Sequence, residues 1–61
     1  MLALLQTNEV EAAGGQPVVL DQEAAFKVVM SFRQHWKMDF ATAAAYINAN
    51  VKSPEVRYNV A

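Results

Sequence analysis

Few side chains in this protein could take part in acid–base or nucleophilic chemistry. His35 is the single histidine among 61 residues, and cysteine is absent. Ser31 lies four residues before His35, so on a helix its hydroxyl would lie next to the imidazole. A serine nucleophile also needs an oxyanion site in a concave pocket, and no loop near this pair supplies one. We therefore interpret His35 as a surface residue and expect no catalytic residues.

The acidic side chains and the glycine pair indicate structural roles as well. Gly14 and Gly15 lack the nearby Lys and Ser or Thr of a phosphate-binding loop. One histidine without cysteine cannot assemble the usual zinc sites. The sequence therefore predicts a protein that is not an enzyme and that binds no metal or cofactor. We interpret the carboxylates as helix caps and solvated charge; they belong to Glu9, Glu11, Asp21, Glu23, Asp39 and Glu55.

The charged residues are distributed unevenly along the chain. Residues 1–23 carry four acidic and no basic side chains, a net charge of −4. Residues 24–61 carry five basic and two acidic side chains, a net charge of +3. A basic second half is compatible with an anionic partner such as nucleic acid, although five cations on 38 residues are also an ordinary protein surface.

A dimeric DNA-binding transcriptional regulator is therefore the alternative function. Asn50 suits the turn of a helix-turn-helix, with the following helix in the DNA groove. Arg57 and Asn59 would then read guanine and adenine, and Lys52 would contact phosphate. A ribbon-helix-helix arrangement with residues 17–20 as the paired strand is the related option. The short last helix and the apolar side chains of that segment argue against both arrangements.

The helix that must position His35 has the clearest pattern. Asp21 is a typical N-cap, and Glu23 places a negative charge where the helix dipole favours it. From residue 22 to about residue 37, apolar side chains recur at spacings of three and four, as on one face of an α-helix. This stripe consists of Ala25, Val28, Val29, Phe32 and Trp36.

The apolar arc of this helix is wider than one stripe, because Phe26 and Met30 extend it to about half of the circumference. So short a chain has few other residues with which to cover it. We therefore predict a partner interface, most simply with another copy, formed by Phe26, Val29, Met30, Phe32 and Trp36. The alternative is that the N-terminal leucines fold back over the arc; these are Leu2, Leu4 and Leu5.

Two shorter helices are expected after the long one. Asp39 is the predicted N-cap of a helix over about residues 40–49, and Asn50 suits its end. Ser53 and Pro54 predict the start of a third helix, which is barely two turns long.

The segment before Asp21 has a different character. The Gly14–Gly15 pair followed by Pro17 predicts a hinge, because paired glycines accept conformations that other residues avoid. Residues 18–20 are apolar and mostly β-branched, which favours an extended conformation. A strand needs a hydrogen-bonding partner, for example the same segment of a second chain.

Together these patterns predict a mainly α fold. A two- to three-helix domain at residues 21–61 would follow a flexible or partly extended N-terminal arm at residues 1–20, and self-association would complete it. The predicted function is a non-catalytic protein–protein interaction module, acting as a homo-oligomeric regulator, inhibitor or assembly component, or bound to a larger protein. The absence of cysteine, of a signal-like N-terminus and of a membrane-length apolar run predicts a cytoplasmic location.

Overall fold

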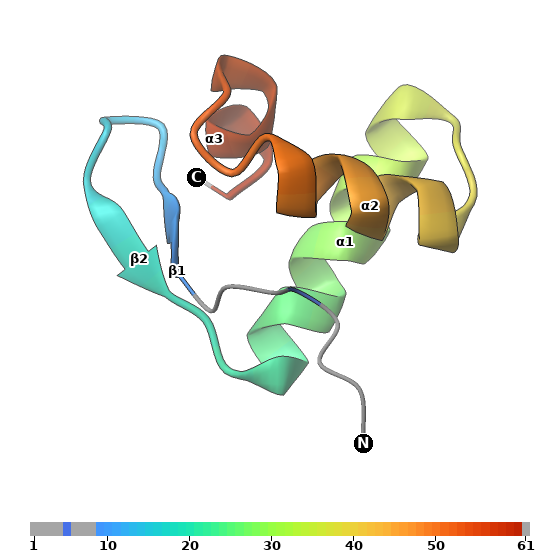
Figure 1. Ribbon diagram of the computed structural model, residues 1–61, viewed down its shortest axis with the longest axis horizontal. Coiled ribbons are helices and arrows are strands. Elements are labelled where there is room, and N and C mark those ends of the chain that lie inside the picture. Colours follow the sequence, from blue (N-terminus) through green and yellow to red (C-terminus); the bar gives the residue numbers. More distant parts are fainter. Residues whose placement is uncertain (1–4, 6–8, 61) are drawn as a thin grey trace.

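The computed structural model describes residue 5 and residues 9–60, and it confirms a mainly α fold. Two short strands, β1 (Glu9–Glu11) and β2 (Pro17–Val19), are followed by three helices. These are α1 (Gln22–Trp36), α2 (Phe40–Ala49) and α3 (Pro54–Val60). Figure 1 shows the two strands as a hairpin beside the helices. Helix α1 packs against both α2 and α3, and β1 packs against α3.

Side-chain caps fix where the helices begin, as the sequence predicts. The Asp21 carboxylate accepts a hydrogen bond of 2.7 Å from the Ala24 amide at the start of α1. Asp39 does the same for the Thr42 amide, also at 2.7 Å, at the start of α2. The side-chain and backbone hydrogen bonds to Thr42 favour the charged carboxylate of Asp39 and hold its pKa below its ordinary value. Local chemistry therefore sets these two helix starts.

The extended segment finds its partner within the same chain. Strands β1 and β2 pair antiparallel, with Val10 opposite Val18. The Gly15 amide donates to the Ala12 carbonyl at 2.8 Å, which closes a tight turn. Gly15 has φ +83°, a left-handed conformation that suits glycine at the bulge of a three-residue hairpin loop. The glycine pair, predicted as a hinge, thus forms the turn of a hairpin.

Pro17 occupies a position in this hairpin where it removes no hydrogen bond. The Ala12 amide donates to the Gln16 carbonyl at 2.7 Å, so these two residues form a hydrogen-bonded pair. Hydrogen-bonded and non-hydrogen-bonded pairs alternate along an antiparallel ladder. The next pair, Glu11 with Pro17, is therefore non-hydrogen-bonded, and the missing N–H of Pro17 faces away from β1.

The hairpin shares one hydrophobic core with the helices. Val10 and Leu20 are buried in that core, and so is Leu5, one of the leucines expected to fold back. Leu2 and Leu4 lie outside the described residues. A flexible N-terminal arm is not confirmed, and self-association is not confirmed. The helices contribute the remaining core residues, which are Ala25, Val28, Val29, Phe32, Ala43, Ile47 and Val56.

The end of α1 is set by a change in backbone conformation. Lys37 adopts a left-handed conformation with φ 55°, and its amide donates to the Arg33 carbonyl. The chain then reverses through Met38 into α2, so the last turn of α1 lies close to α2. None of the helices in the described residues is long and apolar enough to cross a membrane.

Candidate docking groove

The structure divides the five predicted interface residues between the core and the surface. Val29 and Phe32 are 0% and 1% exposed, because α2 and α3 pack against α1 and these two side chains lie in the shared hydrophobic core. On the single folded chain these two side chains are therefore covered by the chain itself, and the predicted partner interface as a whole stays a prediction. Phe26 and Trp36 remain 49% and 45% exposed, and Met30 is half-buried.

Trp36 lies at the edge of a small hollow. As the last residue of α1, it continues the core stripe beyond the point where the neighbouring helices cover it. Phe32 contacts the Trp36 ring with centroids 6.2 Å apart, and Tyr46 of α2 stacks on Phe32 at 5.1 Å. The hollow has a volume of about 160 Å³, and its lining consists of Phe32, Trp36, Met38, Tyr46 and Glu55.

A second and more open hollow adjoins the first, because Trp36 and Glu55 line both. Its volume is about 340 Å³, and His35, Pro54 and Tyr58 complete its lining. We call the two hollows together, with these eight lining residues, the aromatic groove. It lies where the last turn of α1 meets α2 and the start of α3.

Three aromatic side chains form a continuous row in the aromatic groove. The His35 ring meets Trp36 edge-on, with centroids 4.8 Å apart and an interplanar angle of 82°. The His35 ring also lies 5.4 Å from the ring of Tyr58, which is 66% exposed. The imidazole thus contacts both exposed aromatic rings. Ser31, expected as its nearest chemical partner, is exposed on the same helix.

Tyr58 and Glu55 were not singled out as interface residues from the sequence. A signal for Tyr58 exists, because Val56 is fully buried and a residue two positions later on a helix points about 200° away from it. Glu55 lies in the first turn of α3, where it reads as an ordinary helix-start charge. Its role in lining the groove depends on how α3 packs against α1, which the local pattern does not contain.

The other exposed aromatic residue of α1 has different surroundings. Phe26 contacts Phe40 at the start of α2, with ring centroids 5.4 Å apart. Met30 follows Phe26 by one helical turn, which places both side chains on the same face of α1. Together with Phe40 of α2, they define a second apolar region. We call this the Phe26 surface. None of its residues lines the aromatic groove.

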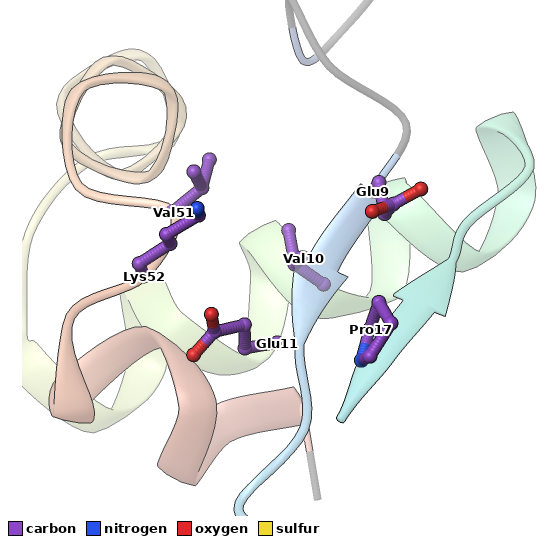
Figure 2. Close-up of a pocket in the computed structure, with 6 residues that line it drawn as sticks. All are labelled: Glu9, Val10, Glu11, Pro17, Val51 and Lys52. Atoms are coloured by element: carbon purple, nitrogen blue, oxygen red, sulfur yellow. The ribbon is translucent and has the colours of Figure 1, made fainter. Parts of the chain in front are cut away.

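A third hollow lies between the hairpin and the turn from α2 to α3 (Figure 2). Its volume is about 230 Å³. Figure 2 shows Val51 and Lys52 on the opposite side of it from Glu9 and Pro17. Val10 and Glu11 also line it. Because the Glu11 carboxylate forms an ion pair of 3.3 Å with Arg57, this region joins the hairpin to α3.

The residues of the DNA-binding alternative are largely occupied within the chain. Both Nε and Nη2 of Arg57 donate to the Lys52 carbonyl, at 3.0 and 2.8 Å. The Asn59 side-chain amide donates to the Glu55 carbonyl at 2.8 Å. Lys52 itself is exposed. Two of the three proposed DNA contacts thus have intramolecular partners, so the structure adds no support for this alternative.

In the part of the chain that the structure describes, no group of three or more His, Cys, Asp or Glu side chains could hold a metal ion. Comparisons of the chain with protein-family models, with curated proteins and with solved structures find no match. The case for a function therefore depends on the surface of the molecule itself.

Proposed function

We propose that this protein is a non-catalytic protein–protein interaction module whose partner binds in the aromatic groove. The observation that supports it is the pair of large aromatic side chains, Trp36 and Tyr58, which are 45% and 66% exposed beside one hollow. Contiguous exposed apolar surface on a small protein is typical of a binding site. Trp and Tyr are also the residues that contribute most often to the affinity of protein interfaces.

The energy available from the groove is large for so small a protein. Covering the exposed parts of Trp36 and Tyr58 would contribute about 2–3 kcal/mol each, from about 25 cal/mol per Å² of apolar surface. A chain of this length has a core that is worth only about 3–5 kcal/mol. A partner bound in the groove would therefore raise the stability of the fold as well as bind to it.

Self-association is the second part of the proposal, and we assign it to the Phe26 surface. Phe26, Met30 and Phe40 are apolar and lie together on α1 and α2, which suits burial against the same surface of a second copy. On this proposal the protein is a cytoplasmic regulator, inhibitor or assembly component. It self-associates through the Phe26 surface and binds a different protein in the aromatic groove.

A peptide selection tests the groove. Random peptides displayed on phage are selected on the immobilised wild-type chain, and each enriched peptide is then measured on two variants. Trp36→Ala should weaken binding by more than about tenfold, whereas Phe26→Ala should change it less than twofold. The two residues are matched controls, because both are aromatic, lie on α1 and are about half exposed. Peptides that bind equally well to Trp36→Ala would contradict the proposal.

Sedimentation from micromolar to millimolar concentration tests the Phe26 surface with the same two variants in reversed roles. Phe26→Ala should weaken self-association and Trp36→Ala should not. A wild-type chain that stays monomeric at millimolar concentration would overturn this part of the proposal and leave the groove unaffected.

A further inference from the structure

We propose that the smaller hollow of the aromatic groove binds an arginine side chain from a segment of another protein. The inference rests on the proposed function for its location, and it adds the chemistry of the partner. It follows from two features that meet in one hollow of about 160 Å³, which is suited to a side chain and not to a whole element. One feature is the aromatic lining, and the other is a carboxylate at its border.

The aromatic lining supplies an attractive environment for a cation. Phe32, Trp36 and Tyr46 line the hollow, with Phe32 in ring contact with both of the others. Phe32 is fully buried, while Tyr46 is half-buried and Trp36 remains about half exposed. A guanidinium group can stack flat on an indole or phenol ring, where the ring's negative face attracts it.

The carboxylate supplies the matching charge. Glu55 lines both hollows of the groove, and no ion pair between the described residues engages its side chain. An arginine whose guanidinium stacks on Trp36 would point its N–H groups outward from the edge of the guanidinium plane, where a carboxylate can accept hydrogen bonds from them. Tryptophan, tyrosine and carboxylate thus combine in one hollow the two kinds of contact that arginine makes best.

The other ionisable groups around the hollow do not offer the same match. His35 lies between Trp36 and Tyr58 in the adjoining hollow, and Lys37 follows Trp36 at the end of α1. Neither lines the smaller hollow, and the one carboxylate in its lining is that of Glu55. Glu55 is exposed, so an apolar side chain in that place would use the rings alone, whereas arginine would use both the rings and the charge.

The test follows the indole N–H signal of Trp36 by NMR in the 15N-labelled full chain. Trp36 is the only tryptophan, so its signal needs no further assignment. Three capped peptides are titrated: Gly-Arg-Gly, the same peptide with citrulline as a neutral isostere of arginine, and Gly-Leu-Gly. The arginine peptide should shift the signal saturably and bind about fivefold more tightly than the citrulline peptide.

Two carboxylate variants complete the design. Glu55→Gln should weaken the arginine peptide about fivefold and leave the citrulline peptide unchanged. Glu23→Gln, which removes an exposed carboxylate from the other end of α1, should alter neither. Equal binding of arginine and citrulline, or an arginine affinity that Glu55→Gln leaves unchanged, would overturn the inference.

The leucine peptide separates this inference from the proposed function. If it shifts the Trp36 signal as strongly as the arginine peptide, the groove is a docking surface but its preference for arginine is refuted. If none of the three peptides shifts the signal, the arginine inference is also refuted. The proposed function is refuted separately, by selected peptides that bind the Trp36→Ala chain as well as the wild type.

Discussion

Helix α1 presents two aromatic side chains to solvent, and their surroundings differ. Phe26 and Trp36 are almost equally exposed, at 49% and 45%. Phe26 has one aromatic neighbour, Phe40, on the adjoining helix. Trp36 lies above the buried Phe32 and lines two hollows that also contain a carboxylate. Exposure alone therefore does not distinguish a binding site; a concave surface with a few polar groups does.

The largest expected effect comes from replacing Phe32, the buried ring that lines the smaller hollow of the aromatic groove. It distinguishes Phe32 from the two exposed rings of α1. Phe32→Ala should lower the free energy of unfolding by about 3–5 kcal/mol, because it leaves a cavity in the core. That loss equals the whole expected stability of so short a chain, so the variant should be largely unfolded by circular dichroism. Trp36→Ala and Phe26→Ala should each remain folded. A Phe32→Ala chain that stays folded would contradict this prediction, because it would show that the fold around the groove does not depend on Phe32.

The second effect compares the two exposed rings directly. Trp36→Ala should weaken a groove-binding peptide by more than about tenfold, as is usual for a tryptophan at the centre of an interface. Phe26→Ala should change that affinity less than twofold, within about 0.5 kcal/mol. Titration calorimetry with a selected peptide measures both. Similar losses in the two variants would mean that the groove and the Phe26 surface act as one site.

A third effect concerns Arg57, whose interactions hold α3 in place and so support the residues of α3 that line the groove. Arg57 joins α3 to the hairpin through Glu11 and to the preceding turn through the Lys52 carbonyl. Arg57→Gln should lower the free energy of unfolding by about 1–2 kcal/mol in a denaturant titration. Because Tyr58 is next to Arg57 on α3, peptide binding in the groove should weaken as well. Glu23→Gln is the control, since it breaks an exposed ion pair within one helix.

The smallest effect concerns Asp39, in the turn that connects Trp36 of the aromatic groove to Phe40 of the Phe26 surface. Asp39 caps α2 between Trp36 and Phe40, and its hydrogen bonds to Thr42 lower its pKa from 3.8. A depressed pKa in the folded state means that this contribution to stability is present above about pH 4 and disappears as the pH falls through the folded-state pKa. In Asp39→Asn, unfolding measured against pH should therefore show a shallower loss of stability in acid. An unchanged acid profile would contradict this.

The helix positions could be predicted because their causes are local. Asp21 and Asp39 precede apolar periods of helical spacing, and the structure places both as N-caps. The hairpin was missed because β1 is only three residues long and two of them are glutamates. Its pairing depends on the turn at Gly15, which the sequence shows only as a break.

The groove could be predicted only in part. Trp36 stands out on the apolar stripe, but the stripe does not show which of its members the other helices will cover. That depends on the packing of α2 and α3, which buries Val29 and Phe32 and leaves Trp36 uncovered. Tyr58 and Glu55 reach the groove through the same packing, so neither is evident from the spacing of residues along α3.

Pro17 has a consequence for how copies of this protein meet. The outer side of β2 carries the exposed Val19, in an apolar run that would otherwise template a third strand from a neighbouring molecule. Proline has no N–H to offer there, so an incoming strand would lose one hydrogen bond at the first position it could pair. The same proline that removes no hydrogen bond from the hairpin thus makes β2 a poorer edge for the addition of a strand from a second molecule.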